Sequence, residues 1–149
     1  MTRRGRWIAL FGVFNVLLIA GCVMMVQTGP KELEKRVTAF WHARETGTYT
    51  FTYSGKQVDL YNDFLAEQTK KQVTQQQYYG RINLKVTNPR IERIEYDKDG
   101  KRATVAIRFD TSFQIAKLKN IRILQTWIVE NGKWVLLDNP MHNPFRSGQ

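Results

Sequence analysis

The side chains that could act as an acid or a base in this chain are few. A general base must reach its substrate and have a pKa that its surroundings have tuned. The candidates are His42, Glu45, Asp59, Asp63 and Asp110. His42 and Glu45 are three residues apart, so their side chains could touch on a helix. Such pairs are ordinary on helix surfaces, and we interpret this one as solvent-facing, with a base in a pocket as the alternative.

Other signatures of catalysis are absent from the sequence. It contains no Gly-rich phosphate loop, no serine elbow and no Cys/His cluster. His42 and His142 are the only histidines and Cys22 is the only cysteine, which excludes a histidine-rich metal site and an intrachain disulfide. We therefore expect a protein that is not an enzyme and that has no cofactor and no metal site.

Aromatic residues are frequent enough to suggest a binding pocket. Aromatic walls with a few polar tips suit an apolar ligand or the side chains of a partner. The alternative is core packing, which we favour for Phe51 and Trp127. The possible pocket residues are Trp41, His42, Glu45, Tyr49, Tyr53, Tyr61, Tyr78 and Trp127.

The chain is basic, with a formal net charge of +10. Without Arg3, Arg4 and Arg6 it still holds 20 basic residues against 13 acidic ones. A basic surface attracts anionic lipid headgroups, acidic polymers or acidic partner proteins, and its simplest interpretation is a soluble basic surface. There is no nucleic-acid-binding motif, so we expect no nucleic acid partner.

A smaller basic patch consists of Lys117, Lys119 and Arg122, near an expected bend between two strands. It could face anionic headgroups. It could equally prevent unwanted pairing at a sheet edge, where lysine is common.

The segment Trp7–Val26 is almost wholly apolar and follows three arginines. A membrane-spanning helix needs about 20 apolar residues, whereas a secretory signal has a shorter apolar run and a small-residue cleavage site. Both interpretations place the arginines in the cytoplasm and the rest of the chain outside it. The predicted anchor residues are Trp7, Phe11, Phe14, Leu17, Leu18, Ile19 and Val26.

Ile19-Ala20-Gly21-Cys22 resembles the bacterial lipobox, in which the cysteine is acylated and becomes the mature N-terminus. Two or more acyl chains anchor a protein stably. Val23–Val26 continues the apolar run, which is typical of an uncleaved helix. We favour lipidation at Cys22, with an uncleaved single span as the alternative.

The first half of the remaining chain predicts helices. After a hinge at residues 27–30, Leu33, Val37, Phe40 and Trp41 follow a helical spacing, and Gly47 is a helix stop. Residues 48–53 predict a short strand or a turn. A second helix is expected over residues 59–79.

The second half predicts antiparallel strands. Ile82, Leu84 and Val86 alternate, residues 91–96 lead into an Asp-Gly turn, and Ala103 to Phe109 alternate on its far side. Residues 121–129 form the next strand, with Leu124 and Ile128 suggesting that both of its faces are partly buried. Asn131-Gly132 is a second hairpin turn before residues 134–137.

These elements predict an α+β fold: an N-terminal apolar helix, then helices packed on a curved antiparallel sheet of about four strands. The expected organisation is a signal or anchor over 1–26, a hinge over 27–30, one α+β domain over 31–138 and an irregular tail over 139–149.

This order of elements resembles the nuclear transport factor 2-like superfamily, a cone-shaped α+β fold related to cystatins. The resemblance rests on the helix end Phe40-Trp41-His42-Ala43-Arg44 and on the hairpin Trp127–Leu136, whose Trp-x-x-x-x-Gly-Lys-Trp pattern is common in small members. A narrower resemblance is to the inner-membrane scaffold component of type IV secretion machines, through Ala43-Arg44-Glu45, Tyr49 and Tyr53. The superfamily includes enzymes, ligand-binding domains and assembly modules, so the fold does not give the function.

We therefore expect a membrane-anchored protein of the bacterial cell envelope, with its domain on the periplasmic side. The expected function is non-catalytic binding of other envelope or membrane-complex proteins. The alternatives are a pocket protein that binds or acts on a small apolar ligand, with His42 or Glu45 as the base, and a type IV secretion scaffold. A homodimer through the sheet is compatible with residues 121–129.

Overall fold

The computed structural model describes residues 28–113 and 116–138. The expected anchor Trp7–Val26 with Cys22 and the expected tail over 139–149 lie outside these described residues. Within them, no helix is both long enough and apolar enough to cross a membrane.

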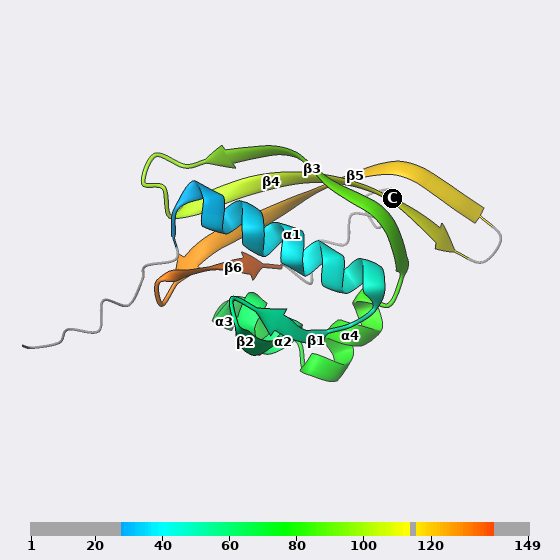
Figure 1. The fold of residues 1–149 in the computed structure, drawn as a ribbon, viewed down its shortest axis with the longest axis horizontal. Coiled ribbons are helices and arrows are strands. Elements are labelled where there is room, and N and C mark those ends of the chain that lie inside the picture. The colour runs from blue at the N-terminus through cyan, green and yellow to red at the C-terminus, as the bar shows by residue number, and fades with distance from the viewer. Residues whose placement is uncertain (1–27, 114–115, 139–149) are drawn as a thin grey trace, which may run out of the picture.

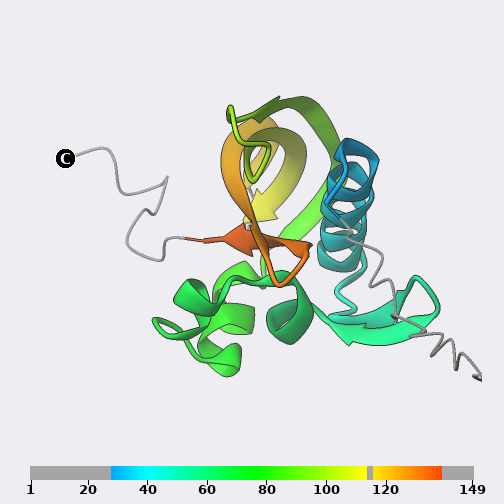
Figure 2. The same ribbon diagram turned by 90° about the vertical axis from the view of Figure 1, so that its left-hand side faces the viewer.

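The fold is α+β, as predicted, with four helices and two antiparallel sheets among the described residues. Figure 1 shows the long helix α1 lying along a curved four-stranded sheet, and Figure 2 shows the short helices packed below. The larger sheet has the order β3-β4-β5-β6, and β1 pairs with β2 in a separate hairpin. The elements are α1 Pro30–Thr46, β1 Thr50–Tyr53, β2 Lys56–Asp59, α2 Leu60–Phe64, α3 Glu67–Lys70, α4 Gln75–Ile82, β3 Lys85–Tyr96, β4 Arg102–Phe113, β5 Ala116–Glu130 and β6 Lys133–Leu137.

Helix α1 follows the predicted pattern. Leu33, Val37, Phe40 and Trp41 are all buried against the rest of the domain. Gly47 ends the helix in the left-handed conformation, with φ of 69°, and its N–H donates to the carbonyl of Ala43. An L-residue with a side chain is strained in that conformation, so the glycine fixes where the helix stops.

The same substitution at two glycines should therefore have opposite effects. We expect Gly47→Ala to destabilise the fold by about 1 kcal/mol because of its positive φ. Gly80 lies inside α4 with a φ outside the left-handed region and with open space around its Cβ position. We expect Gly80→Ala to stabilise the fold by about 0.5–1 kcal/mol, since glycine is a poor helix residue. Urea unfolding of both variants measures this, and equal signs would contradict it.

The prediction of one helix over residues 59–79 is wrong, because this segment forms three short helices. The chain is extended at Leu65 and Ala66, where Leu65 bridges to Leu136 and the Ala66 N–H donates to the Leu136 carbonyl. Pairing with β6 therefore overrides the helical preference of these residues. Thr74 then starts α4 with a capping box, its hydroxyl accepting from the Gln77 N–H.

The predicted strand through Ile82, Leu84 and Val86 is also wrong at its start. Ile82 ends α4, Leu84 is exposed before the sheet, and only Val86 contributes to the buried face of β3. β3 itself continues through Asn88-Pro89, although proline is disfavoured inside a sheet. Asn88 adopts a positive φ of 53° at a β-bulge, so the strand absorbs the proline at its edge.

The core lies between α1, α2, α4 and the inner face of the large sheet. The alternating residues of β4 share the buried face of the sheet: Ala103, Val105, Ile107 and Phe109. On β5, however, Leu124 is 59% exposed, so the prediction that both faces of residues 121–129 are partly buried fails at that residue.

Candidate functional site

His42 and Glu45 line an open groove between α1 and β3 that has a volume of about 360 Å³. Trp41 and the Pro89-Arg90 segment of β3 also contribute to its walls. Both predicted acid–base residues are exposed on the outside of α1 and do not point into the core. The groove is thus a surface feature beside the sheet edge.

The four candidate carboxylates accept hydrogen bonds that hold the fold together. Glu45 accepts from the backbone N–H of Asn88 at 3.0 Å, which holds the bulge of β3 against α1. Asp59 caps α2 by accepting from the Asn62 N–H at 2.8 Å. Asp63 accepts from the Asp59 N–H at 2.8 Å. These carboxylates act as structural acceptors.

Asp110 has the same kind of role. It accepts from the Asn120 N–H at 2.7 Å and from the Asn88 side-chain amide at 3.1 Å. The hydrogen bond from the Asn120 backbone, followed by that from Asn88, lowers the pKa of the Asp110 carboxyl. Asp110, on β4, therefore stays ionised and ties the bulge of β5 to that of β3.

Most of the predicted pocket aromatics lie away from the groove. Tyr49 stacks on Tyr79, with ring centroids 4.5 Å apart. The Tyr53 hydroxyl donates to Glu32 at 2.8 Å, and the buried Tyr61 hydroxyl donates to the Val73 carbonyl at 2.6 Å.

The remaining aromatics fill the core. Tyr78 and Trp127 are buried completely or nearly so. Trp41 touches the groove, but its ring packs at 5.1 Å from that of Phe109, and its indole N–H donates to Gln125 at 3.0 Å. Tyr78 and Trp127 therefore contribute to core packing and do not line the groove.

Burial raises the pKa of several tyrosine side chains, and Tyr79 is one of them. Burial, followed by the hydrogen bond that its hydroxyl donates to Asp59, raises the pKa of Tyr79 to about 12. Tyr79 is thus a neutral donor at any physiological pH. It links α4 to the start of α2, which is a structural role.

Two arginines on α1, the buried Arg36 and the partly buried Arg44, are absent from the sequence-based candidates. Arg36 is 3% exposed, donates to the Asp63 carbonyl at 2.5 Å, and lies 4.1 Å over the ring of Phe64. Arg44 lies 4.8 Å over the Trp41 ring and donates to the Ile82 carbonyl at 3.3 Å. Desolvation lowers the pKa of both guanidinium groups. The signal for Arg36 was its position on the stripe of Leu33 and Phe40.

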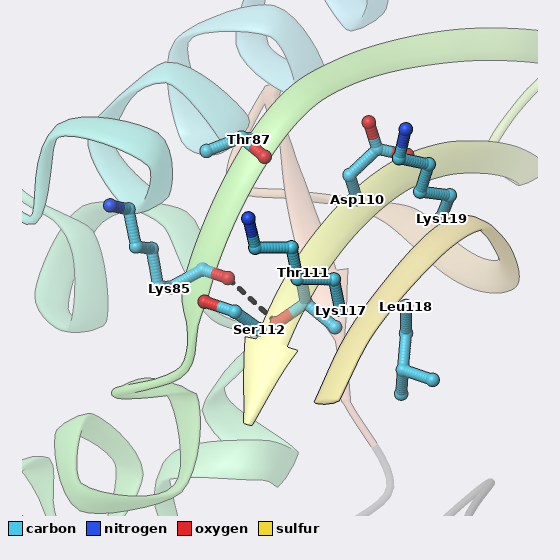
Figure 3. Close-up of a pocket in the computed structure, with 8 residues that line it drawn as sticks. All are labelled: Lys85, Thr87, Asp110, Thr111, Ser112, Lys117, Leu118 and Lys119. Atoms are coloured by element: carbon cyan, nitrogen blue, oxygen red, sulfur yellow. Dashed lines mark hydrogen bonds between the residues drawn. The ribbon is translucent and has the colours of Figure 1, made fainter. Parts of the chain in front are cut away.

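A basic hollow lies at one end of strands β3, β4 and β5, and its residues Lys85 and Lys117 belong to the face opposite the buried row (Figure 3). Its volume is about 220 Å³. Lys85, Ser112 and Lys117 are register partners on three adjacent strands, so they share one face. Val86, the neighbour of Lys85, is fully buried on the other face. The hollow is lined by Lys85, Thr87, Asp110, Thr111, Ser112, Lys117, Leu118 and Lys119.

The structure separates the three members of the predicted basic patch. Arg122 and its register partner Arg108 both bond to Glu92, at 2.5 and 2.9 Å. Lys117 and Lys119 instead line the basic hollow, and no salt bridge within the described residues engages them. With three lysines against the single carboxylate of Asp110, the hollow keeps a net positive charge that a ligand or partner could meet.

The Glu92 cluster predicts a pH dependence of stability. Hydrogen bonds from Arg122 and then Arg108 lower the pKa of the Glu92 carboxyl in the folded state. Its stabilisation is therefore complete above the unfolded pKa and is lost as the pH falls through the ordinary glutamate range and the lower folded pKa. We expect the thermal midpoint of the native chain to exceed that of Glu92→Gln by more at pH 7 than at pH 3. A gap that widens in acid would contradict this.

In the described part of the chain, no group of three or more His, Cys, Asp or Glu could hold a metal ion. No protein-family model matches the chain, and no curated protein matches it. The resemblance to the nuclear transport factor 2-like superfamily stays a prediction.

Proposed function

We infer that this chain is a membrane-tethered, extracytoplasmic domain that binds a partner protein through its surface as an assembly subunit of an envelope complex. The tether is the apolar segment Trp7–Val26, lipidated at Cys22 or retained as a span. The domain is non-catalytic, and its fold is of the nuclear transport factor 2-like kind. A scaffold role like that in type IV secretion is an alternative to this proposal.

The observation that carries the proposal is the filled interior of the domain. Phe40, Phe64, Trp127 and Trp134 are each no more than 1% exposed. An enclosed ligand site would need space where these side chains meet. What can interact is therefore the surface, where large apolar side chains are exposed: Leu84, Tyr96, Leu118 and Leu124.

The proposal is tested on the full chain in its own membranes. The intact mass of the mature protein should begin at an acylated Cys22, or near Met1 if the span is retained. After chemical crosslinking in intact cells, a tagged chain should co-purify with a second envelope protein in a fixed ratio. A chain in the soluble fraction, or one that is isolated alone after crosslinking, would overturn the proposal.

A further inference from the structure

Strand β5 has an edge that no described strand covers. It is 15 residues long, but β6 is only 5 residues long and pairs with Thr126–Glu130 alone. The chain leaves the sheet at Asp138, whose backbone N–H and carbonyl both bond to the Thr69 hydroxyl. Among the described residues, Ala116–Gln125, here called the free edge, therefore pairs with β4 alone.

The register shows which backbone groups point away from β4. Val129 donates its N–H to the Lys101 carbonyl on the β4 side. Hydrogen-bonding direction alternates along an antiparallel strand, so odd-numbered residues down to Ile121 face β4. Arg122 and Leu124 consequently direct their N–H and C=O groups away from β4. They point to the side of β5 on which β6 pairs further along the strand. These are the groups that an added strand would pair with.

The free edge is positively charged. Ala116–Gln125 contains Lys117, Lys119 and Arg122 and no acidic residue. A strand that continues the line of β6 passes Leu124 first and then reaches Lys117 and Lys119, whose ammonium groups line the basic hollow. The ends of β4 and β5 also project beyond the body of the domain, which leaves this edge accessible (Figure 1).

The charge of the free edge indicates which kind of molecule could pair with it. Arg122 is paired with Glu92, but a second copy pairing through the same edge would still bring its own Lys117 and Lys119 with no acid, which is unfavourable across a strand pair. The tail over 139–149 carries Arg146 and two prolines, again with no acidic residue. A lipid surface could contact the lysines but offers no backbone groups. The start of β5 also lies beyond the C-terminal end of α1, far from the N-terminal end of that helix (Figure 1).

We propose that the free edge of β5 binds an extended acidic segment of a partner protein by strand addition, with its carboxylates on Lys117 and Lys119. This inference rests on the proposed function and names the chemistry of the partner. Backbone hydrogen bonds to Arg122 and Leu124 align the segment, and the lysines select acidic side chains. Leu124, at 59% exposure, contributes an apolar contact.

The test uses the full chain in a neutral detergent and a fluorescent peptide of alternating valine and glutamate with blocked ends. Anisotropy should show saturable binding of this peptide, and a valine–lysine peptide should not bind.

Leu124→Pro removes an N–H that β4 does not use, and proline is tolerated at such edge positions. We expect it to weaken binding about tenfold, since it removes one backbone donor and blocks the approach of the strand. Leu124→Ala, which keeps the N–H, should weaken binding only about twofold.

Two further measurements keep the inference falsifiable if Leu124→Pro fails to fold. N-methylation of alternate peptide nitrogens should abolish binding to the native chain. The double change Lys117→Glu and Lys119→Glu should weaken binding about tenfold or more. Equal binding of the N-methylated peptide, or of the lysine peptide, would overturn strand addition. Displacement of the peptide by nanodiscs containing phosphatidylglycerol, with no effect of Leu124→Pro, would assign the surface to lipid instead.

Co-purification from cells with the native chain and with Leu124→Pro distinguishes a failure of this inference from a failure of the proposed function. If a partner co-purifies equally with the native chain and with Leu124→Pro, the chain is an assembly subunit but uses another surface. If no partner co-purifies with either, the proposed function itself fails.

Discussion

Trp127→Ala is expected to lower the free energy of unfolding by about 3–5 kcal/mol. Trp127 is fully buried, and its ring meets that of Phe40 edge-on at a centroid distance of 5.8 Å. Its indole N–H has no hydrogen-bond partner among the described residues, so the lost energy is that of apolar packing and of the cavity left behind. Urea unfolding followed by circular dichroism measures this change.

A matched control lies three residues away on the same strand. Leu124→Ala should change stability by no more than about 0.5 kcal/mol, since Leu124 is exposed. Trp127→Phe should cost much less than Trp127→Ala, because it keeps an aromatic ring and removes the unpartnered N–H. If Trp127→Ala cost less than Leu124→Ala, the filled core described above would be wrong.

Arg36→Ala is expected to destabilise the domain by about 2–3 kcal/mol. The substitution leaves the Asp63 carbonyl without the 2.5 Å hydrogen bond from the guanidinium. It also removes the stacking of that group on Phe64 and its approach to Tyr53, at 4.1 and 5.5 Å from the ring centroids. Thermal and urea unfolding would give the size of the loss.

The companion variant Arg36→Met separates charge from packing. Methionine fills much of the same volume without burying a charge, so this variant should recover a large part of the loss. Lys35→Ala is the control next to it, because the Lys35 side chain is 70% exposed. If Arg36→Met were as destabilising as Arg36→Ala, polar contacts would dominate over packing at this position.

Local patterns in the sequence could predict much of the fold. The spacing of Leu33, Val37 and Phe40 predicted α1, and the alternation of Ala103 to Phe109 predicted β4. These signals are strong because each element packs one regular face against the core. The break of the second helix at Leu65 could not be predicted in this way, since it depends on pairing with Leu136, 71 positions along the chain.

The candidate site was harder to predict. The sequence named His42 and Glu45 as a pair, and the structure places both on one open groove. It could not reveal that Glu45 holds Asn88 or that Asp110 holds Asn120, because both contacts arise at bulges in the sheet. The free edge of β5 follows from the unequal lengths of β5 and β6, which only the register makes visible.

Site-specific photocrosslinking in intact cells tests the central claim most directly, because it asks which surface of the tethered domain meets a partner. A benzophenone amino acid would replace Leu124 or Leu118 on β5, and Lys56 on the exposed β1–β2 hairpin would be the control. We expect one discrete crosslinked protein from the β5 positions and none from Lys56. Crosslinking of the β5 positions to lipid alone or to a second copy of the chain, or equal products from Lys56, would contradict a partner-binding surface on β5.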